Sequence, residues 1–528
     1  MLINMENIVL NKKNKFEFFF VLSAFTGVLA YLIHFHYLPF LSGNESVYFV
    51  KAAMLNDPVL FKNDWTLTNN SFSFGSIFDY YLRPFYWFSN DPITIAKHSR
   101  LVLWLFVIAC FTYLGKTLKL SFLSIFVALN LYLLLGQGQF AGAWIFGGAE
   151  QKVIAYGFLF LSLASLVQKR YVICGLLAGI TFYAHVIIGG WNAIALCLVL
   201  LFRFRSAPYS LLKFSALSLP VAMLVLGFHY FSGLDLPHNA GHTEINVYEL
   251  LVTFRIPHHI DPNSFLNINK LMIFLMFFSL GIYFIFRGGL SRGTKDVAAI
   301  LTLFGLFFII GIVARQLNMY FFLNLYPFRL ADALYPLFLC LFVVETLFIY
   351  IKERLKKSPN FTTPAYIFLV IILSLPFIKI MQTPKITIYP SMSPDFIKMS
   401  NWIKGNTEKN AVFAVNPCNP FLWMMAERAM VVNFKYAPVG YNFAEWYQRL
   451  VTLNGGNSLA KRGGTACLEF KKTFSDLSIN KLVEIREAYG ANYYLTNKNR
   501  SDLYKILMIQ VGDSYLYDIG KMERVGIL

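Results

Sequence analysis

Charged residues are scarce in this chain of 528 residues, at 14%, whereas an ordinary soluble domain carries roughly 25%. Hydrophobic residues make up 57% of the chain, and 54 residues are phenylalanine. A single globular core of this length could not bury so much apolar surface. The composition therefore excludes a water-soluble globule and predicts a membrane protein.

Acidic residues are also few, with 28 Asp and Glu against 46 Lys and Arg and a net charge of +18. In a soluble protein this excess would suggest a nucleic-acid partner. Here the basic residues stand in short runs between long apolar segments, which is typical of the cytoplasmic loops of polytopic membrane proteins. We therefore expect no binding to nucleic acid.

The motifs of nucleotide chemistry are absent: there is no Walker motif, no G-x-S-x-G, no Rossmann glycine fingerprint and no kinase motif set. The predicted inner loops are too short to house a domain for nucleotide sugars. An activated donor would then have to arrive through the lipid phase. No small-residue cleavage site follows the first apolar segment, 16–36, so we expect that segment to remain as an anchor.

The apolar segments predict about eleven transmembrane helices, because a span needs about 20 mostly apolar residues. Every second loop between them is basic, which places the amino terminus in the cytoplasm and the carboxyl terminus outside. Residues 171–202 could form either a hairpin that turns at Gly189-Gly190 or one long, broken helix. The predicted segments are 16–36, 99–115, 120–136, 152–167, 171–189, 190–202, 209–231, 269–286, 296–314, 328–350 and 364–382.

We therefore predict an all-α polytopic membrane domain over 1–382, with an outer loop at 37–98, followed by a small exported α/β domain over 383–528. Cys418 and Cys467 are the two exported cysteines and could pair if the outside is oxidising. The expected tail elements are strands at Val412–Val415, Met430–Val432, Asn492–Leu495 and Tyr515–Asp518, and helices at Pro420–Arg428 and Asn480–Tyr489.

Two acids of the first outer loop are the first candidates for catalysis. Glu45 lies a few residues beyond the first span, and Asp64 follows in the same loop. A carboxylate held near the lipid surface is suited to take a proton from an acceptor hydroxyl. The alternative is that these acids only solvate the loop or cap a helix.

Glu150 and Lys152 follow a glycine-rich outer link and stand at the start of a predicted span. A carboxylate there is favoured by the helix dipole, so capping explains Glu150 as well as substrate binding does.

Near the outer ends of two other spans stand His185 and Arg329. An Arg at that depth needs an anionic partner, which could be Asp332, a lipid headgroup or a bound phosphate, whereas a lone His is more often a helix contact.

The segment 232–268 is rich in histidine, and its sharpest motif contains Arg255, His258 and His259. An Arg with adjacent His can grip a phosphate through charge-assisted hydrogen bonds. A divalent metal is the weaker alternative: His238 and His242 are four residues apart, but no H-E-x-x-H motif is present. A polar surface loop is the third interpretation.

Taken together, these features resemble the GT-C superfamily of integral membrane glycosyltransferases, in an uncharacterised bacterial branch. The resemblance implies a polyprenyl-phosphate-linked sugar donor and chemistry on the non-cytoplasmic face. It implies that Glu45 is the catalytic base or a metal partner, that Glu150 with Lys152 forms the second outer acidic site, and that Arg329 contacts the donor phosphate. The segment Gly43-Asn44-Glu45 lacks the paired acids common in the family, which leaves a divalent metal such as Mg²⁺ or Mn²⁺ an open question.

The function expected from this resemblance is sugar transfer, inverting or retaining, from a polyprenyl-phosphate carrier to a glycan, lipid or protein acceptor. The expected location is a bacterial inner membrane, in contact with membrane lipid. Two alternatives stand beside it. An O-antigen or polysaccharide polymerase would use similar substrates, and a flippase or transporter of lipid-linked sugars would need no catalytic base. A transporter typically has repeated, broken helices with charges at the bilayer midplane, and no internal repeat is present here.

Overall fold

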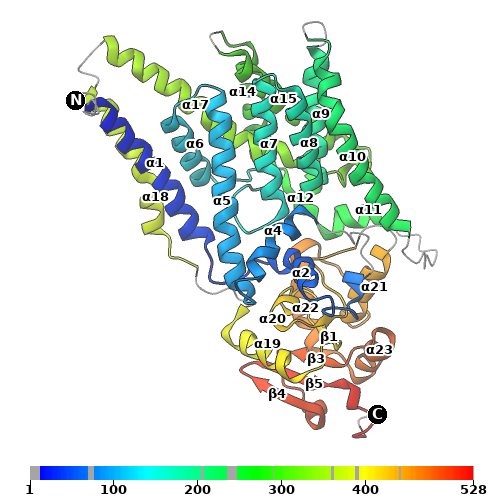
Figure 1. Ribbon diagram of the computed structural model, residues 1–528. Helices are drawn as coiled ribbons and strands as arrows, with labels where there is room; N and C mark the ends of the chain where they lie inside the picture. Colours follow the sequence, from blue (N-terminus) through cyan, green and yellow to red (C-terminus); the bar gives the residue numbers. More distant parts are fainter. Residues whose placement is uncertain are drawn as a thin grey trace, which may run out of the picture.

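The computed structural model describes residues 12–68, 76–203, 207–234, 246–288, 290–357, 362–386, 392–438 and 442–526. Long, roughly aligned helices form one end of the molecule, and a small sheet surrounded by short helices forms the other (Figure 1). The long helices are α1 (Lys12–His36), α5 (Pro92–Thr117), α6 (Phe122–Leu135), α7 (Gln151–Val167), α8 (Tyr171–Ala184), α9 (Val186–Phe202), α10 (Ser210–Leu234), α14 (Ile268–Phe286), α15 (Arg292–Gln316), α17 (Arg329–Lys357) and α18 (Thr362–Gln382).

Each of the eleven expected segments coincides with one of these helices, but their lengths differ. Seven of the helices in the described ranges are long and apolar enough to cross a membrane, which supports a multi-pass membrane protein. The other four, α6 to α9, have 14 to 17 residues. At a rise of about 1.5 Å per residue such helices reach about 21–26 Å, less than the roughly 30 Å of a bilayer core. Seven spans are thus supported rather than eleven.

The chain reverses between α8 and α9 at His185 and not at the expected Gly189-Gly190. His185 has extended backbone angles, and Gly189 instead lies inside α9. A Cβ at Gly189 would come within 2.1 Å of the Phe182 Cα. The glycine is therefore required for the close packing of the hairpin, while the histidine makes the turn.

Short helices lie between the two ends of the molecule (Figure 1). Most belong to the first outer loop and to the segment before α14. They are α2 (Glu45–Asn56), α3 (Trp65–Thr68), α4 (Ile77–Tyr86), α11 (Val247–Leu250), η2 (Leu251–Arg255), α12 (Pro257–Ile260), α13 (Pro262–Phe265) and α16 (Tyr320–Leu323).

The sheet has five strands in the order β2-β1-β3-β5-β4. Strand β1 is parallel to both of its neighbours, β2 and β3, whereas β5 pairs antiparallel with β3 and with β4. Four of the strands overlap strands expected from the sequence, although β2 shares only Met430 with the expected Met430–Val432, and β4 was not expected. The strands are β1 (Val412–Val415), β2 (Ala429–Met430), β3 (Tyr493–Thr496), β4 (Leu507–Val511) and β5 (Ser514–Asp518).

Helices cover both faces of the sheet, and alternate residues of β1 belong to different cores. Phe413 and Val415 pack in the hydrophobic cluster that continues into the long helices, whereas Val412 and Ala414 belong to a second cluster. A shared core fixes the C-terminal part against the helical part. The covering elements are α19 (Pro394–Asn406), α20 (Leu422–Ala426), α21 (Asn442–Leu453), η5 (Gly463–Ala466), α22 (Cys467–Thr473), η6 (Phe474–Asp476), α23 (Ile479–Tyr489), η7 (Ser501–Ile506) and η8 (Ile519–Lys521).

Candidate functional site

A cavity of about 530 Å³ lies where the helical part meets the C-terminal part of the chain. Its lining comes from segments that are far apart in the sequence: the start of α2, the link before α7 with the start of α7, the segment 255–259, the start of α17 with the residues before it, and three segments of the C-terminal part. Four of the lining side chains are cationic and one is a carboxylate. They are Lys152, Arg255, Arg329, Lys435 and Glu150.

Glu150 is the carboxylate of the cavity, and both of its oxygens have partners. Oε1 accepts a hydrogen bond from the Asn44 amide at 2.5 Å, and Oε2 lies 3.0 Å from the Lys152 ammonium. Lys152 also lies over the Trp144 ring, 3.3 Å from its centroid. Only 2% of Glu150 is exposed, so the carboxylate is held in one orientation at the cavity wall.

The link before α7 takes its shape from the carboxylate of Asp332, one turn into α17. Asp332 accepts hydrogen bonds from the backbone amides of Phe140, Ala141 and Ala143 at 2.7, 3.0 and 2.7 Å. Asp332, one of the three anionic partners considered for Arg329, thus binds backbone amides. Gly142, with φ of +68°, makes the turn between these amides, beside the ring of His259.

Two arginines reach the cavity while stacked on aromatic rings. The Arg329 guanidinium lies 4.3 Å from the centroid of Tyr326, and its Nη1 is 3.0 Å from Nε2 of His185. The Arg255 guanidinium lies 4.9 Å from the ring of Phe434. Its Nη2 donates to the carbonyl of Lys435. Both arginines have donor groups left over, because a guanidinium carries five N–H groups.

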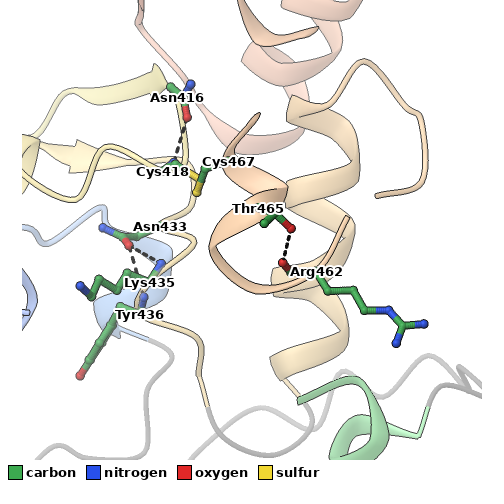
Figure 2. Close-up of a disulfide and its surroundings, with 8 residues drawn as sticks. All are labelled: Asn416, Cys418, Asn433, Lys435, Tyr436, Arg462, Thr465 and Cys467. Carbon is green, nitrogen blue, oxygen red and sulfur yellow. Dashed lines mark hydrogen bonds between the residues drawn. A yellow bond between two sulfur atoms is a disulfide. The ribbon is translucent and has the colours of Figure 1, made fainter. Parts of the chain in front are cut away.

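Lys435 comes from the C-terminal part and lies within the stretch of chain that a disulfide closes into a loop. Cys418 and Cys467, which the sequence left as a candidate pair, are joined, and Figure 2 shows this disulfide beside Lys435. The Asn433 side chain accepts the backbone N–H of Lys435 at 2.8 Å. The Lys435 Nζ would lie 2.8 Å from a Cβ on Gly43, which brings the ammonium to the start of α2.

The two histidines of the 255–259 segment occupy different positions in the wall. His259 Nδ1 lies 2.5 Å from the carbonyl of Ala141, while His258 faces Gly463. Burial lowers the pKa of His259 to about 3, and the neighbouring His258 adds to the effect. Burial and the charges of Arg255 and Lys435 also lower the pKa of His258. Both imidazoles are thus neutral at pH 7, and the positive charge of the cavity comes from Lys and Arg.

Glu45 does not line the cavity. It forms an ion pair with Arg100 in which neither side chain is exposed. Its Oε1 accepts from Arg100 Nε and from the amide of Ala149, both at 2.6 Å, and Oε2 accepts from the amide of Ser42 at 2.7 Å. Both oxygens of Glu45 are thus engaged by protein donors, and the acid predicted to be catalytic lies behind the cavity wall.

Asp64 is likewise buried away from the cavity. Its carboxylate accepts hydrogen bonds from the indole N–H of Trp423 at 2.6 Å and from the amides of Met430 and Leu67 at 2.8 and 3.0 Å. Burial raises its pKa to about 6, against these hydrogen bonds. Asp64 therefore attaches the first outer loop to the C-terminal part.

Most of the residues expected to contact substrate do meet in the cavity. His185 stands behind the wall, where it supports Arg329. The sequence analysis did not single out Arg100 or Lys435 as functional residues. The sequence did contain a signal for Arg100, because an arginine at the start of a predicted apolar span needs a buried partner. The members of the expected set that line the cavity are Glu150, Lys152, Arg255, His258, His259 and Arg329.

The alternative metal site at His238 and His242 lies outside the described residues. Within the described ranges, no three His, Cys, Asp or Glu side chains converge as a metal site would require.

Comparisons with known proteins bear on the fold. Residues 394–453 match a family described as a domain of unknown function, DUF6798, and no curated protein matches the chain. The chain is similar to solved structures of the oligosaccharyltransferase AglB from Archaeoglobus fulgidus. It aligns with the complex with an inhibitory peptide and a dolichol-phosphate at a TM-score of 0.56 and 12% identity, over 92% of this chain and 69% of that one.

Two further structures of the same archaeal enzyme give similar values. The apo form aligns with a TM-score of 0.55 and 11% identity, over 90% of this chain and 69% of that one. The form tethered to an acceptor peptide with the NVT sequon aligns with a TM-score of 0.50 and 13% identity, over 91% and 69%. At this identity the likeness concerns the fold. Over the aligned regions the chain thus shares its fold with the archaeal protein.

Proposed function

We propose that this protein is a membrane glycosyltransferase that transfers a sugar from a polyprenyl-phosphate carrier to an acceptor hydroxyl or amide on the outer face of the membrane. One observation carries the proposal: a single cavity at the ends of the helices combines four cationic side chains with one oriented carboxylate. The cations suit a phosphate, and the carboxylate suits an acceptor proton.

The proposed reaction assigns the carboxylate to Glu150 in place of Glu45. The acceptor oxygen or nitrogen attacks the anomeric carbon and loses its proton to Glu150. The bond between that carbon and the phosphate oxygen breaks, and its electron pair leaves with the lipid phosphate. Arg255, Arg329 and Lys435 stabilise the charge that develops on the leaving group. Fixed cations in a cavity sheltered from water can supply much of the rate in this way.

The neighbours in structure support the choice of substrate class. One of the archaeal structures is a complex with an inhibitory peptide and a dolichol-phosphate, and another is tethered to an acceptor peptide. Dolichol-phosphate is a lipid phosphate of the kind proposed here. The cavity lies at the ends of membrane helices, so a lipid carrier could present its phosphate there without leaving the bilayer.

Mass spectrometry of the reaction products tests the proposal. The purified full-length protein is incubated with polyprenyl-phosphate sugars and a panel of acceptors, and transfer or hydrolysis is measured. We expect Glu150→Gln to lower turnover by about 10²–10⁴-fold while the protein still binds the carrier. The matched control is Glu484→Gln, which removes one partner of an exposed ion pair with Lys481 on α23.

Normal turnover by the Glu150→Gln variant would show that Glu150 is not the catalytic base. Failure of the wild-type protein to release or transfer sugar from any polyprenyl-phosphate donor would contradict the proposed function. A product lengthened by many sugars would indicate a polymerase.

A further inference from the structure

Three acids that the structure describes near the cavity are engaged by protein groups. Glu45 binds Arg100 and two amides, and Asp332 binds three amides of the link before α7. Asp261, just beyond the histidine pair, pairs with Arg315 at 2.9 Å and accepts the amide of Asn263. None of these carboxylates is left to coordinate an ion.

Glu150 does not fit a divalent metal either. Mg²⁺ and Mn²⁺ are held mainly by oxygen ligands, and Mg²⁺ usually binds one or two carboxylates together with substrate phosphates. Here Asn44 donates to one oxygen of Glu150, and the Lys152 ammonium lies 3.0 Å from the other. A metal ion at Glu150 would have to displace a cation that is already there. The donor set of this cavity therefore disagrees with the metal partner that the family resemblance leaves open.

The cationic side chains, by contrast, retain capacity for an anion. Arg255 Nε is buried without a hydrogen-bond partner in the described part of the chain. The ion pairs formed by the described residues include Lys152 but neither Lys435 nor Arg329. Lys435 and Lys152 approach the cavity from the C-terminal part and from α7, so an anion between them would be contacted from two sides.

We infer that this cavity binds its phosphate ligand without a divalent metal ion, and that the side chains of Lys152, Arg255, Arg329 and Lys435 supply the positive charge instead. The identity of the ligand as a lipid phosphate rests on the proposed function. The inference that no metal ion is required rests only on the side chains at the cavity and on the partners that they already have. Among these four cations, Lys435 comes from the C-terminal part of the chain. All four therefore meet in the cavity only when the C-terminal part packs against the helical part.

Binding measurements on the full-length protein in lipid nanodiscs test this inference. The probes are farnesyl phosphate and, in a separate experiment, inorganic phosphate. Each probe is titrated into the protein in a buffer that contains EDTA, Mg²⁺ or Mn²⁺. We expect the dissociation constant for farnesyl phosphate to agree within about twofold among these conditions. Lys435→Gln should weaken binding about tenfold or more, as expected for the loss of one charge-assisted hydrogen bond.

Three variants keep the result interpretable. Lys435→Arg retains the charge and should bind within a few-fold of wild type, and Lys152→Gln should weaken binding as Lys435→Gln does. The matched control is Lys505→Gln, an exposed lysine of the C-terminal part that does not line the cavity, and it should leave binding unchanged. Thermal melting of each variant identifies any that fails to fold.

The outcomes separate this inference from the proposed function. Binding that is lost in EDTA and restored by Mg²⁺ or Mn²⁺ would overturn the inference and leave the glycosyltransferase proposal in place. Binding of inorganic phosphate as tight as that of farnesyl phosphate would support a metal-free anion site and contradict a lipid carrier. The absence of phosphate binding under every condition would overturn both.

Discussion

Arg100 and Glu45 form an ion pair in which neither side chain is exposed to solvent. Arg100 lies in the third turn of α5, and Glu45 begins α2, so the pair ties the segment 37–98 to a long helix. The remaining donors of Arg100 bind the carbonyls of Leu38 and Phe40 at 3.0 and 2.8 Å. A carboxylate with this many partners stabilises the structure and is poorly placed to accept a proton.

The first prediction concerns this pair. Glu45→Gln leaves the Arg100 charge buried without a counter-charge, which should lower the free energy of unfolding by about 3–5 kcal/mol. Thermal unfolding in detergent measures the loss. The double variant Glu45→Met with Arg100→Met should recover part of the stability, because it removes both charges together. A well-folded but inactive Glu45→Gln protein would instead support a catalytic role.

The second prediction concerns the pH dependence of stability at Asp64. Burial raises the pKa of this carboxyl from 3.8 to about 6 in the folded protein. Between these pH values the folded state holds a proton that the unfolded chain releases. The contribution of Asp64 to stability is therefore full below about pH 4 and is lost as the pH rises to 6, by about 3 kcal/mol in total.

Thermal unfolding of wild type and Asp64→Asn at pH 4, 5, 6 and 7 isolates this contribution, because other groups titrate alike in both proteins. We expect the stability of wild type relative to the variant to decline across that range. A difference that stays constant with pH would show that Asp64 has an ordinary pKa.

The third prediction concerns Lys435. Burial lowers the pKa of its ammonium to about 8; Glu150 and Glu45 oppose this shift, whereas Arg255 and Lys152 increase it. Since only the charged form attracts phosphate, affinity for a lipid phosphate should fall as the pH rises through about 8. Isothermal titration from pH 6.5 to 9.5 measures this. In Lys435→Arg the decline should become smaller, because Arg keeps its charge while Lys152, whose pKa burial also lowers to about 8, still loses its own. An unchanged profile in that variant would contradict the role of Lys435.

The fourth prediction concerns the disulfide. Cys418 and Cys467 are 49 residues apart and both line the cavity. Opening a loop of this length should cost roughly 4 kcal/mol of stability through the entropy of the unfolded chain. It should also loosen Gly463 from its contacts with Pro257 and His258, and thereby weaken phosphate binding.

Replacing both cysteines by serine, with melting and phosphate binding measured in parallel, checks both effects. Cys197→Ala, which removes a free thiol in α9, is the control. Unchanged binding in the double variant would show that the disulfide stabilises the C-terminal part without shaping the cavity.

Much of the fold could be predicted because long apolar runs determine where helices form in this chain. The eleven predicted segments fall on eleven helices. The turn at His185 was missed because Gly189-Gly190 has the composition of a turn, while the actual use of Gly189 is close packing against Phe182. Strand β4 was missed because its residues are exposed or only partly buried and give a weak hydrophobic pattern.

The site was predictable only in part. Glu150, Lys152, Arg255 and Arg329 stood out as polar residues near the outer ends of spans, and the fold brings them to one cavity. The choice between Glu45 and Glu150 could not be made from the sequence, because it depends on Arg100, 55 residues from Glu45. Tertiary contacts decide which acid faces the cavity and which is paired behind it.

The most direct test of the account is a structure, by cryo-electron microscopy, of the full-length protein in nanodiscs with a bound polyprenyl phosphate and with EDTA present. We expect density for the phosphate inside the cavity, in contact with Lys435 and Arg329. The Glu150 carboxylate should lie on the side of the cavity where an acceptor would enter. Phosphate density at another surface, with the cavity side chains unchanged from those described above, would contradict it.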